Sequence, residues 1–247
     1  MTDRKEHVLS ALLRQIKEVL DEQSVEFWLE CGTLLGAVRE KEFISWENDI
    51  DLGTWNKNVS ENLKEDIACE LRNRTMKVHI FENYMNIRKG KAHVDIKFYR
   101  LSEDNAIEPK LAPRNLAGKL LSLSSIVFSA PDHYEVDFRA SPLLYNFTKS
   151  ILIIISRLLP SAFIRCLAKM STVLYAKFGA KDATETVPNG YFTDLSTIRF
   201  YGMEFKIPAK TKEYLAYRYG KDWRIPRRDW ITSRDDGAVL NQCTQKS

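Results

Sequence analysis

Residues 27–51 have the sequence FWLECGTLLGAVREKEFISWENDID, which runs from an apolar segment to a pair of closely spaced acids. The β-branched and aromatic residues at its start predict a short strand over 25–30. The small residues Gly32-Thr33 predict a break, and residues 34–39 predict the first turns of a helix. A second strand is expected over 49–54. The segment therefore predicts a strand–turn–helix–strand unit.

The second strand carries two carboxylates on one face. Asp49 and Asp51 are two residues apart, and alternate residues of a strand point to the same side of a sheet. Neighbouring carboxylates repel each other and resist burial, whereas Mg²⁺ or Mn²⁺ binds their hard oxygens. Asp95 lies between Val94 and Ile96 in another expected strand. The three acids together favour a metal site facing substrate phosphates over a pair of surface acids.

Five residues are candidates for substrate binding. Gly32 and Thr33 come before a helix whose N-terminus would offer N–H groups and partial positive charge to a phosphate, although ordinary capping by Thr33 explains them as well. Arg39 and Lys41 follow, and Arg39 can bind a diphosphate through two parallel hydrogen bonds. The alternative for Arg39 and Lys41 is a solvated helix end without a role in binding. Arg88 lies on the hairpin that carries the third acid.

The rest of the first half predicts a mixed sheet with helices beside it, an α+β fold. Apolar spacing predicts helices over 3–22 and 58–73. Extended runs over 77–88 and 92–100 are joined by a turn at Gly90. Residues 1–140 are therefore expected to form the catalytic core.

The second half is expected to be mostly helical and packed on that core over residues 141–232. The expected segments are loops and short strands over 101–140, two helices over 142–178 divided near Pro160, a loop over 184–190, a hairpin over 198–208, a helix over 209–219 and a flexible tail over 233–247.

Composition excludes several classes of protein. The four cysteines and four histidines show no ligand spacing, so a disulfide framework and a zinc site are not expected. A net charge of +4 without a recognisable nucleic-acid module argues against nucleic-acid binding. The N-terminus has no signal-peptide core, which predicts a cytoplasmic protein.

Residues 139–181 contain seven basic residues and no acid, and include an apolar run. Two interpretations remain open. One is a buried helix with a basic outer face, and the other is a surface that rests on an anionic membrane or an anionic polymer.

Residues 27–51 closely resemble the signature of the LicD family, which includes the fukutin-related proteins. The family pattern is a hydrophobic strand, then GTLLGAVR, then a Trp and a carboxylate-rich DID. Residues 94–96 look like the segment with the family's third acid, and residues 201–208 and 214–223 look like its closing hairpin and helix. Where many relatives have two or three acids directly after the Trp, this chain has Glu47-Asn48.

The resemblance implies a nucleotidyltransferase-like fold and a phosphotransferase. Family members move a phospho-alcohol, such as phosphocholine, ribitol phosphate or glycerol phosphate, from a CDP-activated donor to a sugar hydroxyl of a cell-surface glycan or its lipid-linked precursor, and CMP leaves. By this analogy Asp49 and Asp51 bind Mg²⁺ (or Mn²⁺) and the donor diphosphate. Asp95 completes the site and activates the acceptor hydroxyl as a general base. The donor phosphates would be held by Gly32, Thr33 and Arg39.

Two other functions share these residues. One is a nucleotidyltransferase that releases pyrophosphate, and the other is a non-catalytic scaffold or binding member of the family. A cytoplasmic enzyme of cell-envelope polysaccharide biosynthesis, in peripheral contact with the inner membrane face, fits the basic apolar segment best.

Overall fold

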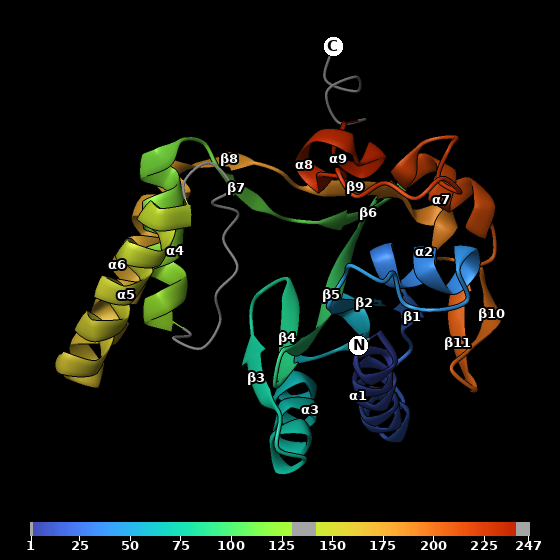
Figure 1. Ribbon diagram of the computed structural model, residues 1–247, viewed down its shortest axis with the longest axis horizontal. Coiled ribbons are helices and arrows are strands. Elements are labelled where there is room, and N and C mark those ends of the chain that lie inside the picture. Colours follow the sequence, from blue (N-terminus) through green and yellow to red (C-terminus); the bar gives the residue numbers. More distant parts are fainter. Residues whose placement is uncertain (1, 130–141, 241–247) are drawn as a thin grey trace. The chain divides into compact units, whose positions relative to one another are not determined.

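A computed structural model describes residues 2–129 and 142–240, which form two compact units (Figure 1). Met1–Pro109 and Thr184–Ser247 form one, here called the sheet unit, and Lys110–Ala183 forms the other, the helical unit. This division differs from the expected boundaries at 140 and 232. The reason is that the chain returns to the sheet after residue 183 and adds strands to it.

The sheet unit contains a nine-stranded mixed sheet with the order β10-β11-β1-β2-β5-β4-β3, and β6 joins β5 to β9. Strands β2 and β5 run parallel, as do β1 and β11, while the other neighbours are antiparallel. The expected α+β fold with a mixed sheet is confirmed. The strands are β1 (Trp28–Leu29), β2 (Asp49–Trp55), β3 (Lys77–Ile80), β4 (Tyr84–Lys89), β5 (Ala92–Ser102), β6 (Asn105–Glu108), β9 (Glu185–Pro188), β10 (Leu195–Phe200) and β11 (Met203–Pro208).

Helices α1 (Thr2–Glu22) and α3 (Glu61–Asn73) pack against each other and cover the apolar face of the sheet. The amphipathic pattern of α1 places Leu13 and Ile16 fully inside the core. Ser60 caps α3 by accepting a hydrogen bond from the backbone N–H of Leu63 at 3.2 Å. In Figure 1 both helices lie below β1 and β2, and α2 (Cys31–Arg39) lies above these two strands.

Two turns in the sheet follow the residues that the sequence offers. Gly90, with φ of +64°, turns β4 into β5, and Gly202, with φ of +76°, turns β10 into β11, as expected. The extended run expected over 77–88 is wrong as a single strand. It is two antiparallel strands, β3 and β4, because the chain reverses at residues 81–83.

The C-terminal part of the sheet unit is more ordered than the sequence suggested. The loop expected over 184–190 is wrong, since β9 and the 3-10 turn Asn189–Tyr191 occupy it. Helix α7 (Thr211–Tyr219) confirms the expected helix, and Gly220, with φ of +84°, ends it. The tail expected from 233 is wrong over 233–240, where the short helices α8 (Thr232–Asp235) and α9 (Gly237–Leu240) lie. Residues 241–247 lie outside the described residues.

In its described residues, 110–129 and 142–183, the helical unit contains three helices, a π-helical turn and a two-stranded ribbon. The two helices expected over 142–178 are confirmed, and the second continues into a π-helical turn. The loops and short strands expected over 101–140 are wrong where α4 forms, because residues 116–129 contain no proline and carry apolar residues at helical spacing. Residues 130–140 lie outside the described residues. The elements are α4 (Leu116–Ser129), α5 (Pro142–Leu158), α6 (Ser161–Leu174), the π-helical turn Tyr175–Gly179, β7 (Leu111–Pro113) and β8 (Ala180–Asp182).

Helix α4 is the centre of this unit, since both α5 and α6 pack against it. A Cβ atom at Gly118 would lie 2.0 Å from the carbonyl oxygen of Gly179, so backbone meets backbone where α4 passes the π-helical turn. No helix within residues 2–129 and 142–240 is long and apolar enough to cross a membrane.

Candidate active site

The parallel pairing of β2 and β5 brings two of the predicted acids side by side. Asp51 is the register partner of Asp95, and Asp49 is the partner of His93. The alternate residues Ile50 and Leu52 are fully buried on the opposite face, toward the helices. The acids therefore share the polar face of the sheet, at the start of two adjacent strands.

Asp95 is held by its other neighbour, β4. Asn86 is its register partner there and donates a hydrogen bond from Nδ2 to Asp95 Oδ1 at 2.6 Å. Burial raises the pKa of Asp95, the Asn86 hydrogen bond opposes this, and the charge of Asp51 raises it further. The sequence pattern missed Asn86, because only the strand register shows that it faces the acid.

Arg88 continues this polar row on β4. Its Nε donates to Asn86 Oδ1 at 3.2 Å. Its Nη2 is buried, and within the described residues it has no hydrogen-bond partner. A buried guanidinium donor without a partner is costly unless a ligand satisfies it. Arg88 therefore lies on the same face as Asn86, two residues along β4, and its role in substrate binding stays a prediction.

Lys97 places a buried cation next to the acids. Its Nζ lies 3.7 Å from Asp51 Oδ1 and 3.8 Å from Glu108 Oε2, and it donates to Cys31 Sγ at 2.9 Å. Burial alone would lower the pKa of Lys97, but the neighbouring anionic groups, among them Glu185 and Glu108, raise it well above its ordinary value. The Lys97 ammonium group therefore lies between the carboxylates of Asp51 and of Glu108 on β6.

Helix α2 begins earlier than the sequence predicted. It starts at Cys31, so Gly32 and Thr33 lie in its first turn and the expected break before residue 34 is wrong. Glu30 occupies the N-cap position, without a capping hydrogen bond from its side chain. The Thr33 hydroxyl oxygen instead accepts a hydrogen bond from the backbone N–H of Asp51 at 2.9 Å. Thr33 thus fixes the acid-bearing strand to the start of the helix.

Gly32 lies directly beside a carboxylate to which the sequence pattern assigned no role. A Cβ atom at Gly32 would lie 2.2 Å from Glu47 Oε2. Glu47 therefore brings its carboxylate to the first turn of α2, where backbone N–H groups have no partner within the helix. Burial, followed by the charges of Asp49 and Asp51, raises the pKa of Glu47 to about 8.

The acidic side chains of this site have the right chemistry to bind a divalent cation, but they do not converge on one point in this structure. Within the described residues, no three His, Cys, Asp or Glu side chains are placed so that they could hold one ion. Burial and mutual repulsion nevertheless raise the pKa of both Glu47 and Asp95, as expected of carboxylates crowded without enough positive charge. Hard oxygen donors of this kind suit Mg²⁺ or Mn²⁺, and rotation of the side chains would be needed to converge on it.

The substrate-binding candidates Arg39 and Lys41 lie at or just after the C-terminal end of α2, whereas Gly32 and Thr33 lie in its first turn. Arg39 ends α2, and its guanidinium donates to Glu40 at 2.6 Å and to the carbonyl oxygen of Trp223 at 3.2 Å. Lys41 is exposed and has a left-handed backbone with φ of +64°. Arg39 thus joins α2 to the C-terminal segment, and phosphate binding by these two residues stays a prediction.

The sheet unit also contains a buried ionic cluster that no sequence motif predicts. Arg218 on α7 is 1% exposed and donates to Glu30 at 2.9 Å and to Glu185 at 2.8 Å. Its Nε donates to both carboxylate oxygens of Asp236 at 3.0 Å. Glu30 also accepts hydrogen bonds from the Tyr214 hydroxyl and, at 2.8 Å, from the Trp28 indole nitrogen. The cluster, here the Arg218 cluster, ties the C-terminal segment to the residue before α2.

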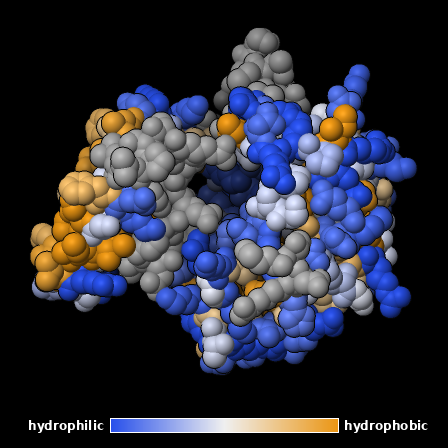
Figure 2. Space-filling view, viewed as in Figure 1, coloured by the Kyte–Doolittle hydropathy of each residue, from blue (hydrophilic) through white to orange (hydrophobic). Residues whose placement is uncertain are grey.

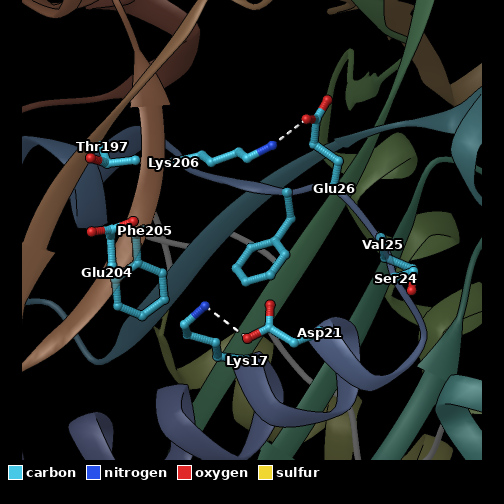
Figure 3. A pocket seen from close by; sticks show the side chains of 10 residues that line it. Lys17, Asp21, Ser24, Val25, Glu26, Thr197, Glu204, Phe205 and Lys206 are labelled. Atoms are coloured by element: carbon cyan, nitrogen blue, oxygen red, sulfur yellow. Dashed lines mark hydrogen bonds and ion pairs between the residues drawn. The ribbon is translucent and has the colours of Figure 1, made fainter.

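A cavity of about 480 Å³ lies elsewhere in the sheet unit, at the edge formed by α1, the start of β1 and β11 (Figure 3). Lys17 pairs there with Asp21 at 2.8 Å, and Lys206 pairs with Glu26. None of the predicted site residues lines it. The first pair lies along α1, the second joins β11 to the segment before β1, and the cavity is separate from the acids.

Residues 24–115 match the LicD family, described as the LicD/FKTN/FKRP nucleotidyltransferase domain. This segment contains the GTLLGAVR motif and all three predicted acids, so the resemblance inferred from the motif is confirmed for it. The fold implied by the resemblance agrees with the mixed sheet and flanking helices of the sheet unit.

Individual relatives match over shorter stretches. The chain is 36% identical over 53 residues to an uncharacterized protein of Rickettsia typhi, which covers 22% of this chain and 17% of that protein. It is 44% identical over 46 residues to the ribitol 5-phosphate transferase FKRP of Homo sapiens, covering 19% of this chain and 9% of FKRP. The matches therefore span a small part of each curated relative.

Two solved structures of the antibiotic-resistance factor ANT(2'')-Ia also align with the chain. A solution structure aligns over 69% of this chain and 95% of that chain, at 16% identity and a TM-score of 0.34. A complex with adenylyl-2''-tobramycin aligns over 67% and 97%, at 14% identity and a TM-score of 0.31.

Proposed function

We propose that the protein is a metal-dependent phosphotransferase that moves a phospho-alcohol from a CDP-activated donor to a sugar hydroxyl. The observation that carries the proposal is the register of β2 and β5, which puts Asp51 beside Asp95 on the polar face of a LicD-type domain. The similarity to FKRP, a ribitol 5-phosphate transferase, supports a phospho-alcohol as the transferred group. The acceptor is a cell-surface glycan or its lipid-linked precursor.

In this reaction the acceptor oxygen bonds to the phosphorus that carries the alcohol. The bond from that phosphorus to the bridging oxygen breaks, and CMP leaves with the bridging oxygen. Asp95 takes the proton of the attacking hydroxyl. Burial and Asp51 raise the pKa of Asp95, which strengthens it as a base, and Asn86 fixes its orientation.

The donor diphosphate needs positive charge and hydrogen-bond donors. Asp49 and Asp51 would hold Mg²⁺ or Mn²⁺, which supplies charge neutralisation to the diphosphate when bound. Arg88 offers its buried Nη2. Residues Gly32 and Thr33 offer N–H groups of the first turn of α2.

Arg39 and Lys41 are the outer candidates for the same donor. Arg39 already donates hydrogen bonds to Glu40 and to the Trp223 carbonyl, so it would have to share its guanidinium with a phosphate. Lys41 is exposed and would approach the donor from solvent. Their contribution is therefore expected to be smaller than that of Arg88.

The test is release of CMP. The full chain is incubated with Mg²⁺ and CDP-choline, CDP-glycerol, CDP-ribitol or a nucleoside triphosphate, with and without glycan acceptors, and CMP and pyrophosphate are both measured. Asp51→Asn and Asp95→Asn are run beside Asp66→Asn, which changes an exposed acid on α3. CMP release from one donor, lost in the first two variants and kept in the third, is the expected result.

Other outcomes would replace the proposal. Release of pyrophosphate from a nucleoside triphosphate would make the protein a nucleotidyltransferase, which uses the same acids. Neither product, together with no Mg²⁺ binding by calorimetry, would leave a non-catalytic scaffold.

A further inference from the structure

The helical unit exposes far more apolar surface than the sheet unit does. Large apolar side chains are exposed along all of its helices, whereas in the described part of the sheet unit the exposed ones are Val8, Leu101 and Ile225. Figure 2 shows this as an orange surface over the region of α5 and α6, against a mainly blue sheet unit. Soluble surfaces rarely carry contiguous apolar patches unless something binds there.

On α5 the exposed apolar residues form one stripe. They are spaced four, three and four residues apart, which places them on one side of a helix. The inner side of α5 carries Leu152 and Ile153, which pack against α4. The exposed stripe therefore lies on a different side of α5 from the residues that pack in the core of the helical unit. Its members are Phe147 (67% exposed), Ile151 (41%), Ile154 (56%) and Leu158 (77%).

Helix α6 repeats the arrangement. Its buried residues are Ala168 and Ser171, which lie on the side of α4. Phe163, Met170 and Val173 are exposed at helical spacing on another side. Each of the two helices thus packs against α4 with one side and exposes a second, apolar side.

Positive charge borders these stripes. Arg165 and Lys169 lie one turn apart on α6, beside its apolar stripe, and Arg157 lies beside the stripe of α5. Lys177 and Lys181 follow and are also exposed. Between residues 138 and 181 the chain has no acidic residue. The surface is therefore apolar at its centre, basic at its margin and free of negative charge.

We propose that α5 and α6 dock on an anionic lipid bilayer, with their apolar stripes among the acyl chains and their basic residues at the lipid phosphates. An apolar stripe with basic borders is the pattern of helices that lie in the membrane interface. A second copy of the chain would bring basic residues against basic residues across a symmetric interface, which repel. The docking surface is independent of the catalytic proposal.

The test is co-sedimentation of the full chain with vesicles of phosphatidylcholine, with or without phosphatidylglycerol. Binding is expected only when the anionic lipid is present, and it weakens with added salt. Removing two charges in Arg165→Gln/Lys169→Gln should lower the partition coefficient roughly tenfold or more. The double variant Phe147→Ser/Leu158→Ser should lower it at least as much. Val8→Ser and Lys212→Gln change exposed residues of the sheet unit and should leave binding unchanged.

Circular dichroism of every variant separates lost binding from lost folding. Light scattering of the lipid-free chain is expected to show a monomer. Absence of vesicle binding by the folded chain would overturn the proposal. A dimer that Phe147→Ser/Leu158→Ser converts to a monomer would overturn it too, because a second copy would then be the occupant.

Discussion

Two groups of carboxylates in the sheet unit differ in how their charge is balanced. In the Arg218 cluster, Glu30, Glu185 and Asp236 surround one guanidinium, and each accepts at least one hydrogen bond from it at 3.0 Å or less. In the second group, here the strand acids (Glu47, Asp49, Asp51 and Asp95), Lys97 forms an ion pair with Asp51 at the longer distance of 3.7 Å.

The two groups differ in whether hydrogen bonds from a cation offset the burial of their carboxylates. Burial in the Arg218 cluster is offset by short charge-assisted hydrogen bonds, which join segments far apart in sequence. Among the strand acids, burial and mutual repulsion raise the pKa of Glu47 and Asp95 instead. Strained electrostatics of this kind cost stability and are typical of sites that await a charged ligand.

The largest effect is expected from Arg218→Met. The substitution leaves three buried carboxylates without their cation, so it should lower the free energy of unfolding by about 3–5 kcal/mol. Urea unfolding followed by tryptophan fluorescence measures it. Arg72→Met is the control, because Arg72 makes an exposed ion pair with Glu65 at 3.5 Å and should cost less than about 1 kcal/mol. Equal effects of the two variants would show that the cluster has no special role.

Asp95→Asn is expected to lower activity strongly without lowering stability, whereas the main effect of Arg218→Met is on stability. The substitution removes a buried charge beside Asp51 and keeps the shape of the side chain, so the melting temperature should stay the same or rise. Loss of a general base typically lowers the rate about 10²–10⁴-fold. Thermal melting and CMP release on the same sample test both halves. A variant that melts well below the wild type would place Asp95 with the structural carboxylates.

Asp49, Asp51 and Asp95 were predictable because the information for them is local. Asp49 and Asp51 share a face by their spacing, and the apolar neighbours of Asp95 mark its strand. The register that puts Asp51 beside Asp95 follows only from the pairing of β2 with β5. Glu47 lay within the same motif, but nothing in its spacing shows that it reaches Gly32.

The Arg218 cluster was not predictable because its partners are distant in sequence. Arg218 and Glu30 are 188 residues apart. The segment with Asp236 is rich in polar residues, which resembles a disordered tail until its burial beside Arg218 is known. Strand β9 was not predicted either, because residues 184–190 are mostly polar and form a strand only by pairing with β6.

Addition of Mg²⁺ should stabilise the strand acids and leave the Arg218 cluster unaffected. A cation bound to the folded state at about a hundred times its dissociation constant adds about 2.7 kcal/mol, because binding shifts unfolding by mass action. The melting temperature of the wild type should therefore rise with Mg²⁺, and that of Asp51→Asn should not. Asp66→Asn, on the surface of α3, should respond like the wild type. A rise of equal size in Asp51→Asn would locate the ion elsewhere.

A small effect on stability is expected from Gly32→Ala, which tests the position of the Glu47 carboxylate. The new Cβ would lie 2.2 Å from Glu47 Oε2, and the carboxylate, at the end of a flexible side chain, should move away at a cost below about 1 kcal/mol. If the Glu47 carboxylate belongs to the donor site, CMP release should fall although stability hardly changes. Gly202→Ala is the matched control at a glycine with open space around it, and it should lower stability through its φ of +76° but leave the rate per folded molecule unchanged. Full activity in Gly32→Ala would mean that the Glu47 carboxylate, unlike Asp51 and Asp95, can leave its place without consequence for the reaction.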